Sequence, residues 1–149
     1  MMWGGIRRDG RTALVIIETP PGLTADRYVE EVLEPHVLSQ REEIGEGFIL
    51  QQDNARPHIA QVTREFLQAE GIEVLVWPAN SPDLNPIEHL WDELKRRVNK
   101  RNNRNLQELR QAIIEEWHNI PQDLINKIIK SMRRRCQAVL AANGGATRY

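Results

Sequence analysis

Two carboxylates stand where the sequence could deliver them to a divalent metal ion. Asp53 ends the segment Gly47–Asp53, which begins with an apolar run, and Glu88 follows Asn85 and Pro86 at the start of an amphipathic segment. The first pattern predicts the end of a strand, and the second predicts the first turn of a helix. Hard divalent cations prefer oxygen ligands, and paired carboxylates can hold them for phosphoryl-transfer chemistry.

Each of these carboxylates also has a purely structural explanation. Glu88 stands three residues after Asn85, where its side chain could reach back to the N-cap amide and favour the helix dipole. Asp53 could end its strand through local turn bonds. The spacing of 34 residues between the two, together with the Asn54 and His58 that follow Asp53, favours a metal site.

Two motifs resemble a known family. The segments QQDNARPH (residues 51–58) and SPDLNPIEHLW (residues 81–91), in this order, resemble the catalytic domain of mariner-superfamily transposases, a resemblance that extends over nearly the whole chain. The last two members of that family's acidic triad have the spacing of Asp53 and Glu88. The resemblance implies that these two are catalytic metal ligands, with Mg²⁺ or Mn²⁺ as cofactor, in DNA strand cleavage and transfer during transposition and integration.

The resemblance also implies an α/β fold, namely a ribonuclease-H-like mixed sheet flanked by helices, with a helical C-terminal region. The family's first catalytic Asp lies on a strand upstream of Met1, so we expect a sheet without that first strand and a catalytic domain that is inactive as this 149-residue stretch. One alternative is a non-catalytic remnant that binds DNA or a full-length transposase. Another is a nuclease that works with two carboxylates and a different third ligand.

The distribution of charge predicts where DNA would bind. Residues 1–90 carry 7 Lys/Arg against 15 Asp/Glu, whereas residues 91–149 carry 13 against 6. A basic region can bind phosphates without reading the sequence, although a solvated helix surface explains the same pattern. The cations expected to contact phosphate follow Glu88 on the same predicted helix or just after it: Arg96, Arg97, Lys100, Arg101 and Arg104.

Arg56 and His58 follow Asp53 closely and are further candidates for contact with a substrate phosphate. Packing at the start of a helix explains His58 equally well. The expected partners are therefore transposon ends and target DNA, together with a second copy of the chain or a full-length transposase.

The first half of the chain predicts strands over residues 1–6 and 12–18, joined by a hairpin turn in which Asp9-Gly10 adopts positive φ. Thr24 is expected to cap a helix that buries Tyr28 and that ends or kinks at Pro35. Residues 40–47 are charged and contain two glycines, which predicts a surface loop.

A parallel βαβ unit should follow. It consists of a buried strand over Gly47–Asp53, a helix from Pro57 to Gly71, and a strand over Ile72–Trp77. Three more helices are predicted, with apolar stripes over residues 87–98, 106–117 and 124–140.

We therefore predict a single, incomplete catalytic domain over residues 1–149, with an α/β core that carries the acidic site in 1–104 and C-terminal helices in 105–149. The one cysteine, Cys136, cannot form an internal disulfide, which favours a reducing intracellular setting. The resemblance narrows this expectation to the nucleus. No apolar run approaches the roughly 18 residues of a membrane span, so no membrane contact is expected.

Overall fold

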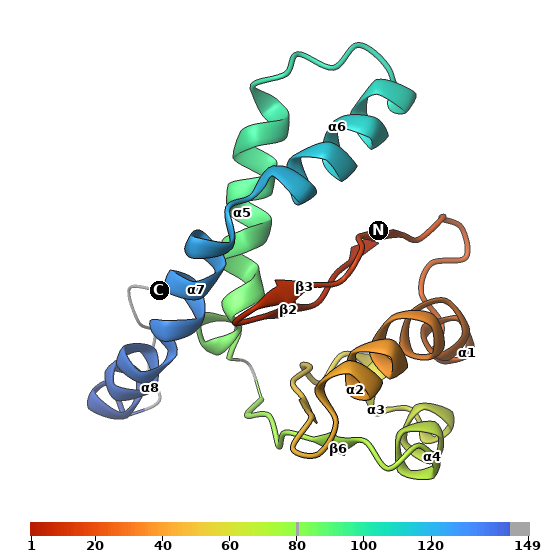
Figure 1. The fold of residues 1–149 in the computed structure, drawn as a ribbon, viewed down its shortest axis with the longest axis vertical. Coiled ribbons are helices and arrows are strands. Elements are labelled where there is room, and N and C mark those ends of the chain that lie inside the picture. The colour runs from red at the N-terminus through yellow and green to blue at the C-terminus, as the bar shows by residue number, and fades with distance from the viewer. Residues whose placement is uncertain (80, 144–149) are drawn as a thin grey trace. The chain divides into compact units, whose positions relative to one another are not determined.

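The computed structural model describes residues 1–79 and 81–143, which form two compact units. The first unit contains Met1–Gly4 with residues 12–79, and the second contains Gly5–Arg11 with residues 81–143. Figure 1 shows the helices and strands of both. The last six residues of the predicted C-terminal part lie outside the described residues.

The N-terminal hairpin is confirmed. In the first unit β1 (Met2–Trp3) pairs antiparallel with β4 (Val15–Ile16), and in the second β2 (Ile6–Arg7) pairs antiparallel with β3 (Gly10–Arg11). The expected positive φ at Asp9-Gly10 is wrong, because the turn is formed by residues 8 and 9, and none of residues 8–10 has positive φ. Gly10 instead lies close to a side chain, since a Cβ there would be 2.9 Å from Arg7 Nε.

The first long helical run consists of α1 (Ala25–Tyr28), the π-helical η1 (Val29–Val37) and α2 (Leu38–Ile44). Thr24 caps it as predicted, because its hydroxyl accepts a hydrogen bond from Arg27 N at 3.3 Å. Pro35 does not end the run, because the wider π turn accommodates a ring that would clash in a regular α-helix. The surface loop predicted for residues 40–47 is therefore wrong up to Ile44, and Gly45, with φ of 74°, ends the helix.

The βαβ unit is parallel, as predicted. In it β5 (Ile49–Leu50) pairs with β6 (Glu73–Val74), and the connection contains α3 (Arg56–Ile59) and α4 (Gln61–Ala69) in place of one helix. The prediction of a buried strand is wrong for Ile49, which is 48% exposed. A strand is fully buried only when both faces are covered, and this sheet consists of two strands of two residues each among the residues described.

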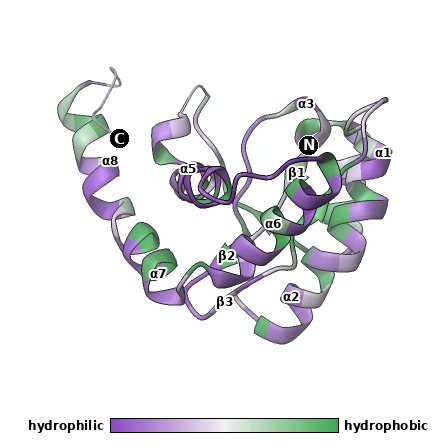
Figure 2. Ribbon diagram, turned by 90° about the horizontal axis from the view of Figure 1, so that it is seen from above, coloured by the Kyte–Doolittle hydropathy of each residue, from purple (hydrophilic) through white to green (hydrophobic). Residues whose placement is uncertain are grey.

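The core of the first unit lies between its helices and its short strands. It is formed by side chains that the helical and strand periodicities place on inward faces, and Figure 2 shows how hydrophobic and hydrophilic stretches alternate along the helices. The buried members are Ile17, Tyr28, Val32, Leu33, Val37, Leu67 and Ile72.

The second unit is helical apart from β2 and β3. Its helices are α5 (Pro86–Asn99), α6 (Leu106–Asn119), α7 (Gln122–Lys130) and α8 (Met132–Ala141), preceded by the 3₁₀ turn η2 (Pro82–Leu84). The expected single helix after residue 121 is divided at Ser131.

Contacts between α5 and α6 form the centre of the second unit. Trp91 of α5 stacks on Trp117 of α6, with ring centroids 5.3 Å apart. Arg11, at the end of β3, donates to the carbonyl oxygens of Trp117 and Ile120 at 2.6 and 2.5 Å. The C-terminal end of α6 is thereby joined to the hairpin within the second unit.

Candidate metal and nucleic-acid site

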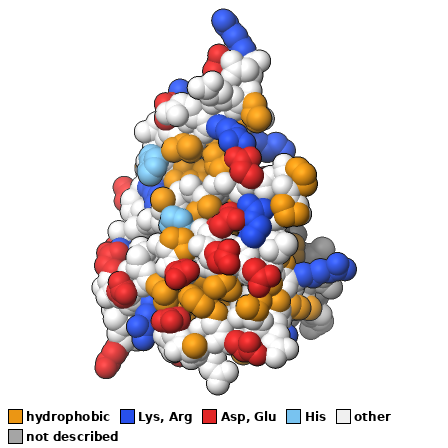
Figure 3. Space-filling view, turned by 90° about the vertical axis from the view of Figure 1, so that its right-hand side faces the viewer, with side chains coloured by type: hydrophobic (Ala, Val, Ile, Leu, Met, Phe, Trp, Pro, Cys, Tyr) orange, Lys and Arg blue, Asp and Glu red, His pale blue; other side chains and the backbone are white. Residues whose placement is uncertain are grey.

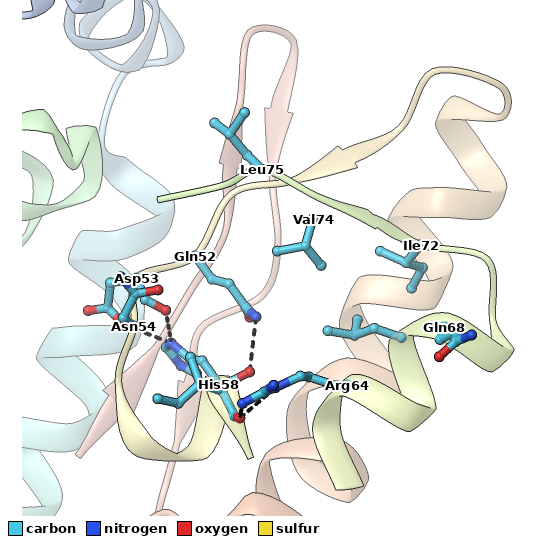
Figure 4. A pocket seen from close by; sticks show the side chains of 11 residues that line it. Gln52, Asp53, Asn54, His58, Arg64, Gln68, Ile72, Val74 and Leu75 are labelled. Carbon is cyan, nitrogen blue, oxygen red and sulfur yellow. Dashed lines mark hydrogen bonds and ion pairs between the residues drawn. The ribbon is translucent and has the colours of Figure 1, made fainter. Parts of the chain in front are cut away.

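Asp53 lies in the loop after β5, where neighbouring groups hold one oxygen of its carboxylate. Its Oδ1 accepts a hydrogen bond from Ala55 N at 2.9 Å and lies 2.8 Å from His58 Nδ1 (Figure 4). The Asp53 side chain is nonetheless 48% exposed. The carboxylate is therefore oriented by its neighbours and still accessible to a ligand.

His58, on α3, is held from two directions. Its Nδ1 also lies 3.2 Å from the Asp53 carbonyl oxygen, and its ring packs on that of Tyr28 with centroids 4.5 Å apart. These contacts support the packing role that the sequence left open for His58. They also show that the packed ring orients Asp53.

Behind this pair lies a hydrogen-bonded connection that sequence reasoning missed. The hydroxyl of Tyr28 donates to Gln52 Oε1 at 2.7 Å, and Gln52 Nε2 donates to the carbonyl oxygen of His58 at 3.4 Å. A tyrosine is protonated at neutral pH and can donate, and burial raises the pKa of the Tyr28 hydroxyl further above its ordinary value. One signal was available, because a tyrosine on a buried helix face usually needs a partner for its hydroxyl.

A pocket of about 420 Å³ opens beside Asp53 within the first unit. Its wall combines polar side chains of the loop after β5, polar and apolar side chains of α3 and α4, and apolar side chains from Ile72 to Leu75 (Figure 4). The loop is also tied to the segment after β6, because Asn54 Nδ2 donates to the Trp77 carbonyl oxygen at 3.0 Å. The pocket's lining residues are Gln52, Asp53, Asn54, His58, Ile59, Arg64, Leu67, Gln68, Ile72, Val74 and Leu75.

Glu88 lies in the first turn of α5, as predicted, and its side chain is exposed. Asn85 is the N-cap residue, and its carbonyl oxygen accepts a hydrogen bond from Glu88 N at 3.3 Å. Asp53 belongs to the first unit and Glu88 to the second. Among residues 1–79 and 81–143, no three His, Cys, Asp or Glu side chains are grouped as a metal site.

Three of the predicted phosphate-binding arginines, on α5 or just after it, have acidic partners. Arg96 and Arg97 both pair with Glu93, the second at 2.6 Å, while Arg101 pairs with Glu115 of α6 at 2.6 Å. Hydrogen bonds from Arg96 and Arg97 hold the pKa of Glu93 below its usual value, so this carboxylate stays charged at neutral pH. Much of the charge of this cluster is therefore balanced inside the second unit.

The remaining candidates lie at the surface. Arg56, in the first turn of α3, is exposed, and so are Lys100, the C-cap of α5, and Arg104, between α5 and α6. Figure 3 shows acidic, basic and hydrophobic side chains interspersed on one face of the molecule. No helix in the described part of the chain is long and apolar enough to span a membrane.

Comparison with known sequences identifies relatives of this chain. Residues 1–110 match the model of a family described as DDE superfamily endonuclease. The chain is 43% identical over 124 residues to the Tc1 transposase of Caenorhabditis elegans, covering 83% of this chain and 44% of that protein. It is 35% identical over 151 positions to the Tcb2 transposase of Caenorhabditis briggsae, covering 100% of this chain and 54% of that protein. The chain thus spans about half the length of these curated relatives.

Solved structures share the fold. The catalytic domain of the Mos1 mariner transposase superimposes with a TM-score of 0.83 at 19% identity, covering 99% of this chain and 74% of that one. The Mos1 paired-end complex with Mn superimposes with a TM-score of 0.82 at 22% identity, covering 95% of this chain and 43% of that one. These likenesses confirm the predicted α/β, ribonuclease-H-like fold class. Together with the match to the family model, they show that the chain belongs to the DDE superfamily endonucleases, among the Tc1 and mariner transposases.

Proposed function

We propose that this chain is part of a DNA transposase and contributes Asp53 and Glu88 to metal-dependent cleavage and transfer of DNA strands. Family membership supports the reaction class. The observation that carries the proposal is the Asp53 carboxylate, which Ala55 and His58 orient at the end of β5 while it stays half exposed. A carboxylate in this state can bind a cation without first being extracted from a buried ion pair.

The metal ligands that the chain would supply suit Mg²⁺ or Mn²⁺. Asp53 and Glu88 both offer exposed carboxylate oxygens, which suit hard cations. Solved structures of the Mos1 catalytic domain with Mg and with Mn support the same choice of ion. Such an ion, when bound, would stabilise charge on the oxygens of a reacting phosphodiester. The role of the chain is to supply the carboxylates and, through His58 and Ala55, to fix the direction of one of them.

DNA and a second transposase copy are the proposed partners. The Mos1 relatives include a strand transfer complex and paired-end complexes, one of them with the left transposon end. We therefore propose transposon ends and target DNA as substrates, and the nucleus as the place of action. Arg56, His58 and the cations of α5 remain proposed phosphate contacts, although Arg96, Arg97 and Arg101 would have to share their charge with existing carboxylate partners.

Divalent metal is expected to stabilise the folded chain if Asp53 and Glu88 bind it. At a free Mn²⁺ concentration ten times Kd, linkage predicts about 1.4 kcal/mol of added stability. Asp53→Asn and Glu88→Gln should each lose this gain, because an amide lacks the anionic charge that a hard cation needs. The measurement is the melting temperature with and without millimolar Mn²⁺.

Exposed acids away from the site provide the matched controls for this experiment. Asp26→Asn, in the first turn of α1, and Glu42→Gln, on α2, remove the same charges and should keep the full response to Mn²⁺. A full response in Asp53→Asn or in Glu88→Gln would remove that residue from the site. A parent chain that binds DNA without responding to metal would instead favour the non-catalytic remnant.

A further inference from the structure

The segment with the least compensated charge in the second unit is the pair of helices α7 and α8. Residues 121–143 contain five Lys or Arg and one acidic residue, Asp123. Four of these cations are exposed, and we call them the α7–α8 basic face: Lys127, Lys130, Arg133 and Arg134. Among the described residues, none of the four has an Asp or Glu oxygen within 4.0 Å.

Anchoring contacts fix which side of these helices faces the unit. Ile125 of α7 is fully buried, and so is most of Arg135 of α8. Arg135 donates to Ser131 Oγ at 2.8 Å and to the Asp83 carbonyl oxygen at 3.1 Å. The fifth cation of this segment therefore points inward and has a structural role, while the other four stay on the solvent side.

The spacing of the exposed cations suits a line of phosphates. Lys127 and Lys130 are three residues apart and lie on one face of α7, and Arg133 and Arg134 lie in the first turn of α8. Ser131 between the two helices keeps helical dihedrals, with φ of −70° and ψ of −16°. Three residues of helix rise about 4.5 Å, so Lys127 and Lys130 can face neighbouring phosphates of one DNA strand, which rise about 3.4 Å each.

The predicted cations on α5 and just after it are less available to bind phosphate. Three of the four arginines predicted in that region pair with carboxylates of the second unit, and Glu93 accepts from two of them. Ion pairs near the protein surface are weak, so these could be broken, but the nearby acid also weakens the local positive potential. A basic face whose cations form no ion pair in the described part of the chain, and whose segment contains five cations and one acid, attracts a polyanion more strongly.

From this contrast we propose that the α7–α8 basic face, rather than α5, makes the main phosphate contacts of this chain with duplex DNA. The contact involves the backbone of the duplex, so it gives affinity without sequence preference. The inference rests on the proposed function, in which DNA is the substrate, and it specifies the surface that holds the duplex.

The test compares two variants that each remove four positive charges from the 149-residue chain. One carries Lys127→Gln, Lys130→Gln, Arg133→Gln and Arg134→Gln. The matched control carries Arg96→Gln, Arg97→Gln, Lys100→Gln and Arg101→Gln. Binding to a fluorescent duplex of arbitrary sequence is measured by anisotropy between 50 and 200 mM KCl, and circular dichroism establishes that each variant is folded.

We expect the α7–α8 variant to bind roughly 10- to 100-fold more weakly than the parent at the lowest salt. The magnitude of its slope of log K against log salt should fall by about 0.9 for each phosphate that the variant no longer neutralises. The α5 control should bind only a few-fold more weakly. A third variant that exchanges Lys for Arg and Arg for Lys at the four α7–α8 positions keeps the charge and should bind like the parent.

Two results would overturn the inference, namely equal weakening in both four-Gln variants or a larger effect in the α5 control. A parent chain that binds no DNA would overturn the proposed DNA substrate as well.

Discussion

Replacing Trp117 with alanine is expected to lower the free energy of unfolding of the second unit by about 3–5 kcal/mol. Trp117 is fully buried in α6, and its ring stacks on Trp91 of α5. Alanine would remove most of this buried aromatic surface and leave a cavity between the two helices, which the backbone could close only in part. A loss of this size is a large fraction of the stability of a small unit.

Urea unfolding followed by circular dichroism at 222 nm measures the effect of Trp117→Ala. Leu106→Ala is the matched control on the same helix, because Leu106 is 65% exposed and its truncation should change stability by less than about 0.5 kcal/mol. Similar midpoints for the two variants would contradict the assignment of Trp117 to the centre of the unit.

Local chemistry made several elements predictable from the sequence. Thr24 and Asn105 begin helices at positions where their side chains accept hydrogen bonds from Arg27 N and Glu108 N, and such caps depend only on neighbours three residues away. Gly71 ends α4 with positive φ, as glycine at this position often does. The order of strand, helix and strand in the βαβ unit followed from hydrophobic periodicity together with Pro57 and Gly71 at the helix ends.

Breaks within helical patterns were not predictable, because nothing in the local sequence opposes the helix there. Ala60 is a good helix former, yet its ψ of 153° separates α3 from α4. After the break, Thr63 is fully buried and donates to the carbonyl oxygen of Pro57 at 2.6 Å. A contact of this kind belongs to the folded arrangement of α3 and α4, so periodicity cannot reveal it.

In the candidate site, too, contacts between sequence neighbours were predictable and contacts between distant residues were not. Asp53 and His58 were both candidates from the sequence, and they are five residues apart, so their contact is local. Tyr28 and Gln52 are 24 residues apart, so their hydrogen bond depends on how α1 packs against the loop after β5. Arg97 and Arg101 pair with carboxylates of α6 that are similarly distant in sequence. These ion pairs balance positive charge that the composition alone suggested was available to DNA.

Tyr28→Phe removes the hydroxyl of Tyr28 and keeps the ring that packs on His58. Gln52 Oε1 would lose its donor, which should cost about 1–2 kcal/mol at neutral pH, since Gln52 is only partly buried. The same variant should also change how stability depends on alkaline pH.

The sign of that change follows from burial, which raises the pKa of Tyr28 above the value of about 10 that a tyrosine has in the unfolded chain. Above pH 10 the unfolded chain releases this proton while the folded chain keeps it. The contribution of Tyr28 to stability is therefore complete below pH 10 and is lost progressively as the pH rises above 10.

Urea unfolding between pH 8 and pH 11 should show a steeper alkaline loss of stability in the parent than in Tyr28→Phe. Tyr149, the only other tyrosine in the sequence, is present in both proteins and cancels in the comparison. Identical alkaline profiles would mean that Tyr28 is not held protonated by burial and would weaken its assignment as the donor behind the Asp53 site.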